Sequence, residues 1–145
     1  MAVQLIATLT NTARQREAQG TVTGKSFKIV SFEVGTEGHD PSDPLVALPP
    51  DPTINELPGR VFGPEPVDNL GYLSPTCPYW ELTIEDGEAN GTLISSIALI
   101  AEIVSNGDDA VDEVGTTFIY AVAHFPRVPK VPGDTFEYLV GIQVG

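Results

Sequence analysis

The sequence predicts a mainly β protein: an antiparallel β-sandwich or small barrel with one short N-terminal helix and a long irregular loop. Three observations predict this class. The second half of the chain holds several runs rich in β-branched and aromatic residues, separated by turn residues. Only one short stretch near the N-terminus has helix start and stop signals. The 14 Gly and 13 Pro exceed average usage and argue against a helical bundle.

The length of 145 residues fits one domain, and at that size folding can bury roughly two thirds of the surface of the unfolded chain. We therefore expect one domain over residues 1–145. Its expected parts are an N-terminal segment with the helix (1–26), a strand (27–35), a Pro-rich wrapping loop (36–78) and an antiparallel sheet (79–145).

The predicted helix lies in the stretch "LTNTARQREAQG". Thr10 suits the N-cap, Asn11 to Gln19 would form the body, and Gly20 suits the left-handed position after the last turn. So short a helix is not stable alone in water. We therefore expect it to dock on the rest of the domain.

A strand follows in "FKIVSFEVG", which is rich in β-branched and aromatic residues and ends at Gly35. The next stretch, 36–78, is the least regular and holds most of the prolines. It is nevertheless too apolar to be a free linker, because it contains Leu45, Val46, Leu48, Leu57, Val61 and Phe62. We expect this loop to pack across the domain or against a neighbouring chain.

Two strands with different patterns begin the second half. In "YWELTIED", Trp80, Leu82 and Ile84 alternate with polar residues, as in a strand with one wet face. In "TLISSIALIAEIV", both alternating sets are apolar: Leu93, Ile97, Leu99 and Ile103 on one side, and Ile94, Ile100 and Val104 on the other. A strand of this kind is covered on both faces, by the domain's own elements or by another subunit.

Two further strands, "TTFIYAVAHFP" and "DTFEYLVGIQV", are joined by a proline segment. Pro126, Pro129 and Pro132 remove three backbone donors, so this segment should run extended along a sheet edge before Gly133 turns it. A stiff segment loses little entropy on docking and suits a contact surface. An equal alternative is that the prolines only block edge-to-edge aggregation.

Eight residues are candidate partner contacts. The proline segment contributes Phe125, Arg127, Val128, Lys130 and Val131, and the doubly apolar strand contributes Ile94, Ile100 and Val104.

Few side chains suit catalysis or metal binding. His39 and His124 are the two histidines, and we expect His39 to be a solvated loop residue and His124 to pack on a strand. Cys77 is the one cysteine, and neither a nucleophile motif nor clustered zinc ligands occur. The run from Asp86 to Gly91 is similar to the first half of a calcium loop, but Ile97 stands where the bidentate Glu should be. We therefore expect a hairpin turn there, and no catalytic residue, cofactor or metal.

The charge balance is strongly acidic, with 20 acidic against 7 basic residues and a net charge of −13. Such a field repels phosphate backbones and anionic membranes, so we expect neither nucleic acid nor membrane as a partner. A single cysteine fits folding in a reducing cytosol. Without a basic leader or a long apolar run, we expect no export signal and no membrane anchor.

Three stretches resemble one family: "LTNTARQREAQG", "FKIVSFEVGTEGHDPSDP", and "IALIAEIV" with the later "TTFIYAVAHFPRVPKVPGDTFEYLVGIQV". They are similar to the N-terminal attachment domain of bacteriophage tail-collar and tail-fibre proteins. The resemblance implies a virion structural protein that binds other tail, baseplate or fibre proteins. It also implies a homo-oligomer, with a trimer favoured, located in the virion tail after assembly in the host cytoplasm.

No shaft sequence follows the last strand, so the resemblance favours a stand-alone adaptor or baseplate component. The alternative is a soluble ligand-binding module similar to carbohydrate-binding β-sandwiches, with Trp80, Tyr79 or Tyr72 as stacking platforms. Because Trp80 alternates in register with Leu82 and Ile84, the pattern favours a core position for it.

Overall fold

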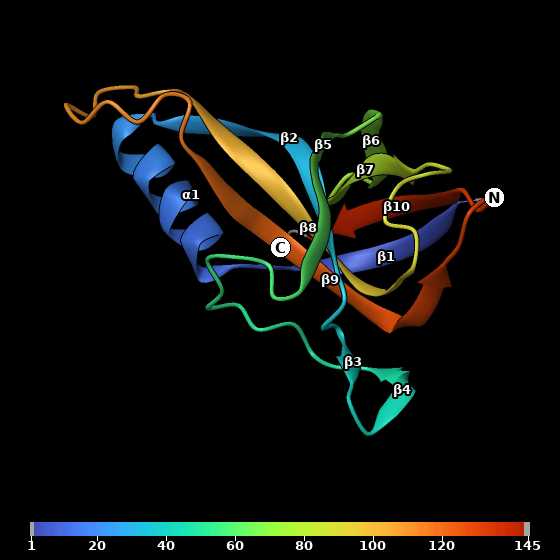
Figure 1. The fold of residues 1–145 in the computed structure, drawn as a ribbon. Helices are drawn as coiled ribbons and strands as arrows, with labels where there is room; N and C mark the ends of the chain where they lie inside the picture. Colours follow the sequence, from blue (N-terminus) through green and yellow to red (C-terminus); the bar gives the residue numbers. More distant parts are fainter. Residues whose placement is uncertain (1, 144–145) are drawn as a thin grey trace.

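A computed structural model describes residues 2–143 and shows a two-layer β-sandwich with one helix at one end (Figure 1). This confirms the predicted class. In chain order the elements are β1 (Val3–Leu9), α1 (Asn11–Thr23), β2 (Ser26–Gly35), β3 (His39–Asp40), β4 (Asp43–Ala47), β5 (Arg60–Pro66), β6 (Asn69–Ser74), β7 (Cys77–Ile84), β8 (Thr92–Ser105), β9 (Thr117–Lys130) and β10 (Phe136–Ile142).

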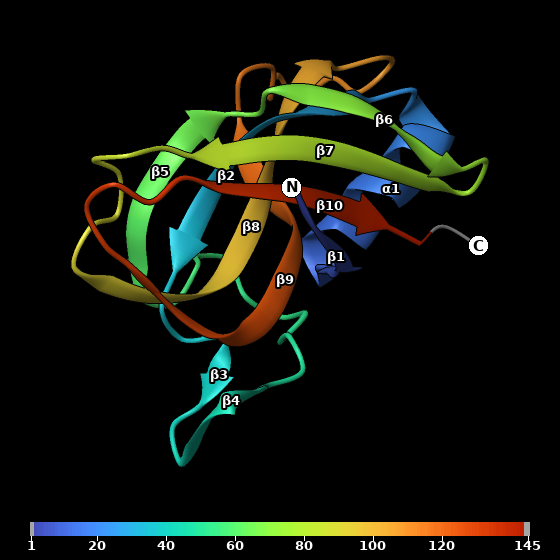
Figure 2. The same ribbon diagram turned by 90° about the vertical axis from the view of Figure 1, so that its right-hand side faces the viewer.

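One continuous sheet makes both layers, because it folds over at β1. The strand order is β5-β2-β8-β9-β1-β10-β7-β6. The first part of β1 pairs in parallel with β10, and its last two residues, Thr8 and Leu9, pair antiparallel with β9. Figure 2 shows β10, β7 and β6 crossing over the strands of the other layer. Within residues 2–143, β5 and β6 at the ends of this order do not pair, so the fold is a sandwich and not a closed barrel. The parallel pair makes the sheet mixed, where we expected an antiparallel one.

The main core lies between the two layers. Alternate side chains of each strand meet there, as the period of two requires. Its fully buried members include Phe32 and Val34 from β2, Ile97 and Leu99 from β8, Leu82 and Ile84 from β7, and Val140 from β10.

Strand β8 is covered on both faces by the chain itself. Every residue from Ile94 to Ala101 is buried. Ile94, Ile97 and Leu99 face the main core, while Ala98 and Ile100 pack with Leu57 in a second cluster on the outer face. Ile94 was expected on the face of Ile100, but the register shift between Ile94 and Ser96 turns it to the core. Since Leu57 comes from the Pro-rich segment, that segment packs in cis here. The doubly apolar strand therefore does not need a second subunit to bury it.

The expectation that 36–78 is one irregular loop was wrong, because it contains β3, β4, β5 and β6. Strand β5 pairs with β2 and β6 pairs with β7, each at one end of the sheet order. Edge strands tolerate proline because half of their backbone donors face away from the sheet. Between them the chain crosses from layer to layer: Val67 N donates to Val30 O (3.3 Å) and Asp68 N to Glu81 O (2.8 Å).

The helix begins as predicted and ends one turn later. Thr10 Oγ1 accepts a hydrogen bond from Ala13 N (3.1 Å) and donates to Ile119 O in β9 (2.6 Å). The left-handed residue after the last turn is Gly24 (φ 78°), not Gly20. Gly20 has a different role, because a Cβ there would lie 2.7 Å from Lys25 O. The glycine lets the chain return close to the helix.

The proline segment runs extended along an edge, as predicted. Beyond Val122, β9 has lost its partner β1 and pairs with β8 alone among the described residues. The register there places the three residues from Phe125 to Arg127 opposite the single Ser95, which is a bulge, where proline is tolerated. Gly133 (φ 94°) then turns the chain into β10. The last strand was expected to reach Val144, which lies outside the described residues.

Replacing Leu57 by Ala should destabilise the protein, since this side chain is 6% exposed and covers the outer face of β8. We expect the free energy of unfolding, measured by urea denaturation, to fall by about 2–4 kcal/mol. Leu45→Ala is the control, because Leu45 is 79% exposed and its truncation should change the value by less than about 0.5 kcal/mol. Equal losses of stability in the two variants would contradict the conclusion that Leu57 covers the outer face of β8 within one chain.

Candidate functional site

The most prominent surface feature is the β3–β4 hairpin, which projects from the body of the sandwich (Figures 1 and 2). We call residues 39–47 the arm. Its side chains include Leu45, which is 79% exposed, and Val46, which is 45% exposed. Two carboxylates fix its turn: Asp40 accepts from Ser42 N (2.8 Å) and Asp43 from Leu45 N (3.2 Å). The arm therefore holds large apolar side chains in water on a locally braced turn.

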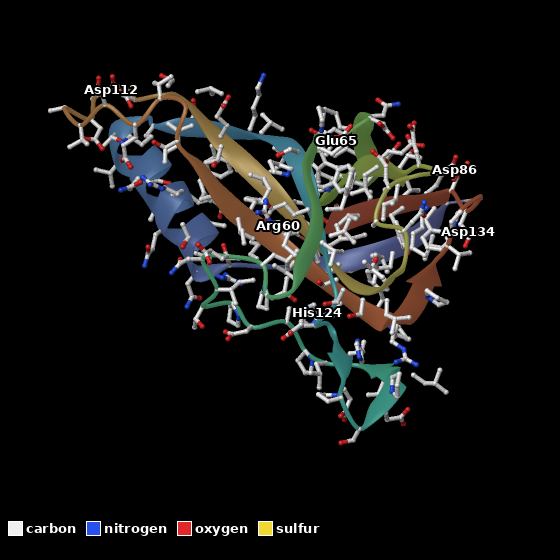
Figure 3. All side chains as sticks on the ribbon, viewed as in Figure 1. Arg60, Glu65, Asp86, Asp112, His124 and Asp134 are labelled. Carbon is white, nitrogen blue, oxygen red and sulfur yellow. The ribbon has the colours of Figure 1, made fainter. Side chains whose placement is uncertain are left out.

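The root of the arm is fastened to β8 and β9. Ser95 Oγ accepts from Gly38 N (2.7 Å) and lies 3.0 Å from His39 Nδ1. On the returning side, Leu48 N donates to Gly38 O (2.8 Å) and His124 Nδ1 donates to Leu48 O (3.0 Å). Figure 3 shows His124 where the arm joins the sandwich.

Both histidines therefore have structural roles. His124 lies half-buried on a strand, as predicted, whereas His39 is not a solvated loop residue, because β3 holds it against Ser95. The Ser95–His39 pair has the hydrogen bond of a nucleophile and base, but Ser95 Oγ also accepts from Gly38 N, and Ser95 lines neither of the two cavities on the outer face of the sheet. Sequence reasoning missed this pair because its members lie 56 positions apart.

Four of the eight candidate contacts are inside the chain and not on its surface. Ile94 is fully buried and Ile100 is 7% exposed, because β8 is covered on both faces. Phe125 is 6% exposed and its ring centre lies 5.4 Å from that of Tyr138. Lys130 is fully buried, donates to Asn90 Oδ1 (3.0 Å) and lies 5.9 Å from the centre of the Phe136 ring. These positions were wrong as surface contacts of the folded chain.

The other four candidates do not form one surface. Arg127 is exposed, Val128 is half-buried and Val131 is 47% exposed, all at the end of β9 that pairs with the start of β8. Val104 is 42% exposed at the opposite end of β8. Because β4 lies against β9, the exposed part of the proline segment belongs to the same side of the molecule as the arm. Whether these residues touch a partner stays a prediction.

The aromatic residues proposed as stacking platforms do not share one face. Trp80 is half-buried, packs against the main core and has its ring centre 6.2 Å from that of Tyr120. In the β6–β7 pair, Tyr79 stands opposite Gly71 while Tyr72 stands opposite Pro78, so the two tyrosines are on opposite faces of the sheet. Tyr79 and Tyr72 therefore do not form a joint platform, and Trp80, which shares the face of Tyr72, packs against the main core.

The turn from Asp86 to Gly91 joins β7 to β8, but the expectation of a hairpin was wrong, because β7 pairs with β10 and β6 while β8 pairs with β2 and β9. The connection instead crosses from one layer of the sandwich to the other. Two of its oxygens are occupied by donors of the chain: Asp86 Oδ1 accepts from Gly133 N (2.8 Å) and Asn90 Oδ1 from Lys130 Nζ. Among residues 2–143 no three Asp, Glu, His or Cys side chains gather in a way that suits a metal ion. In the same range, the helix is too short and too polar to cross a bilayer.

Two cavities flank Leu57 on the outer face of the β2–β8–β9 layer. The larger has about 390 Å³, and its charged lining includes the Arg60–Glu33 ion pair (3.2 Å). The smaller has about 200 Å³ and lies between the stretch 48–58 and the side chains of Ser96 and His124. Burial lowers the pKa of His124, although its bond to Leu48 O opposes this shift.

A charged cluster at the helical end of the sandwich fixes the β8–β9 loop. Glu113 is bonded to Arg16 (2.8 Å) and to Lys25 (2.6 Å), and Lys25 also reaches Asp109 (2.8 Å). The hydrogen bonds from Arg16 and then from Lys25 lower the pKa of Glu113 to about 2. Hydrogen bonds to Asp109 and Glu113 raise the pKa of Lys25. The sequence did not indicate this cluster, because Lys25 and Glu113 are 88 positions apart.

Comparison of the chain with protein-family models, with curated protein sequences and with solved structures gives no match. The resemblance to the phage attachment domain stays a prediction that rests on the quoted stretches.

The substitution Glu113→Gln should make the stability of the protein less dependent on pH in acid. The folded-state pKa of Glu113 (about 2) lies below its ordinary value of 4.5, so the unfolded chain takes up this proton first as the pH falls. The stabilisation by this carboxylate is complete above pH of about 4.5 and is lost towards pH of about 2. Urea midpoints measured on dilute protein across this range should fall more steeply for the wild type than for Glu113→Gln. Parallel curves would contradict the role of the cluster.

Proposed function

We propose that this chain is a structural protein of a phage virion, a baseplate or fibre-attachment adaptor that binds neighbouring tail proteins. The observation that carries the proposal is the arm, which exposes Leu45 and Val46 away from the sandwich. Leu45 and Val46 are consecutive residues of β4 and point to opposite faces of the arm. Exposed apolar side chains on both faces of a projecting element offer contact area to another protein. The choice of a phage tail as the assembly rests on the resemblance of the strand and helix sequences to tail attachment domains.

The geometry of the arm suits insertion into a neighbour. Its turn is braced by Asp40 and Asp43, so little conformational freedom remains to be lost when the turn is bound. Its root is held on both sides, by Ser95 and by His124, so force on the arm is transmitted to β8 and β9. The exposed edge at Arg127 and Val131 extends this contact surface, because β4 lies against β9.

The partners proposed are other tail, baseplate or fibre proteins, in a virion assembled in the host cytoplasm. The threefold self-association implied by the resemblance is part of this proposal, but β8 gives it no support, because that strand is buried within one chain. The arm supports contact with another chain and does not select between a copy of this protein and a different one.

Leu45→Asp should abolish incorporation into particles while leaving the fold intact. A carboxylate at the arm would have to be desolvated in the contact, whereas in the free chain the position is 79% exposed. We expect at least a tenfold lower amount of the variant in purified virions, measured by quantitative mass spectrometry, with an unchanged melting temperature.

Val22→Asp is the matched control, because Val22 is 84% exposed on α1, far along the chain from the arm, and the change in charge is the same. It should be incorporated like the wild type. Absence of the wild-type chain from purified particles would overturn the proposed function, and normal incorporation of Leu45→Asp would overturn the role of the arm.

A further inference from the structure

The smaller cavity beside Leu57, which we call the strap pocket, contains a polar atom without a partner. Ser96 is 1% exposed, and its Oγ is the one buried side-chain oxygen or nitrogen among the described residues that makes no hydrogen bond. Leaving a buried hydroxyl unbonded costs about 1–3 kcal/mol. A group that enters the pocket and bonds to Ser96 would recover this cost.

The backbone leaves room for that hydroxyl. Gly35 of β2 stands opposite Ser96, and a Cβ at Gly35 would lie 2.6 Å from Ser96 Oγ. On the other side His124 of β9 stands opposite Ser96 in register, so the hydroxyl and the imidazole share the outer face of the sheet. Glycine at position 35 thus leaves the space that Ser96 Oγ occupies, and the Leu57 side chain of the pocket wall lies close to the same point, 3.1 Å from the Cβ position.

The polar groups around the pocket are acceptors. His124 Nδ1 carries its hydrogen, because it donates to Leu48 O, and its lowered pKa leaves the ring neutral at neutral pH with Nε2 as an acceptor. Asp51 is ionised, since hydrogen bonds from the Thr53 side chain and backbone lower its pKa, and Glu37 adds a second carboxylate at the rim. No Lys or Arg lines this pocket, in contrast to the larger cavity with its Arg60.

The remaining walls are apolar. Leu48, Ile54 and Leu57 line the space that leads to Ser96. A ligand that fits must therefore combine hydrogen-bond donors and positive charge at its tip with a methylene stem, as a lysine side chain does. The pocket lining offers acceptors for its three donors in Ser96 Oγ, His124 Nε2 and the carboxylates of Asp51 and Glu37.

We propose that the strap pocket binds the primary ammonium group of a lysine side chain presented by a partner protein. The net charge of −13 favours a cationic partner through the field of the whole chain. The inference rests on the proposed function only for the source of the lysine, since the pocket itself is complete within one chain. Its position next to the root of the arm places the lysine at the rim of the same contact.

The test is a titration of the full chain, labelled for NMR, with Nα-acetyl-lysine methylamide. The control probe is Nα-acetyl-norleucine methylamide, which keeps the aliphatic stem and lacks the ammonium group. We expect saturable shifts of the His124 ring and of the Ser96 and Leu57 amides with the lysine probe, and at least tenfold weaker binding of the norleucine probe. Equal binding of both probes, or no saturable shift with lysine, would overturn the inference.

Ser96→Ala provides the matched variant, because it removes only the unbonded hydroxyl and should not lower the melting temperature. We expect it to weaken binding of the lysine probe about tenfold, as loss of one hydrogen bond to a charged group does. Ser74→Ala, on an exposed edge of β6, should bind the probe like the wild type. Unchanged binding by Ser96→Ala would show that the ammonium group does not bind at Ser96 and would overturn the proposal.

The two proposals fail separately in these experiments. Loss of lysine binding in Ser96→Ala with normal particle incorporation would show a pocket that the virion contact does not use. Normal amine binding by a chain that is absent from particles would leave the strap pocket established and the proposed function overturned.

Discussion

The whole arrangement depends on the burial of β8 from both sides. An inner strand with Ile97 and Leu99 on one face and Ile100 on the other must be covered twice, because each large apolar side chain left in water costs about 1.5–3 kcal/mol. The second layer of the sandwich covers one face, and the chain around Leu57 covers the other. Because the stretch 48–58 lies across β8 and β9, the residues between the end of β2 and this stretch leave the sheet and come back to it. Most of these residues form the arm.

Covering β8 in cis also changes what the surface can be used for. An exposed apolar strand would have demanded a second subunit, whereas a covered one leaves the arm and the proline edge as the places where another protein can add contacts. The same cover creates the strap pocket, since residues 48–58 bridge over Ser96 and His124 without filling the space. Stability, the arm and the pocket thus follow from one packing requirement.

Much of the fold could be predicted from local signals. The N-cap at Thr10, the strand ending at Gly35 and the alternation around Leu82 follow from patterns within a few residues, and all three are present. The edge position of the proline segment followed from its missing donors. The strands β5 and β6 were missed because edge strands accept proline and are specified by their partners in β2 and β7, not by their own composition. The parallel pairing of β1 with β10 joins the two ends of the chain and leaves no local trace.

The site was less predictable than the fold. Lys130 turns inward because the bulge opposite Ser95 shifts which β9 side chains face the core, and no pattern in "HFPRVPK" reveals that shift. Phe125 precedes the shift and faces the core in simple alternation with Ala121 and Ala123. The arm was hidden inside a stretch whose many prolines suggested a loop. The bonds at its root join residues 56 and 76 positions apart, so only the folded chain brings them together.

Native-state amide hydrogen exchange at several protein concentrations would show whether a single chain covers both faces of β8. We expect the amides from Ile97 to Ala101 to exchange only through global unfolding, with protection that does not depend on protein concentration down to the dilute monomer. Fast exchange of these amides in the monomer, or protection that grows as the protein concentration rises, would contradict burial within one chain. Either result would mean that a second subunit covers β8.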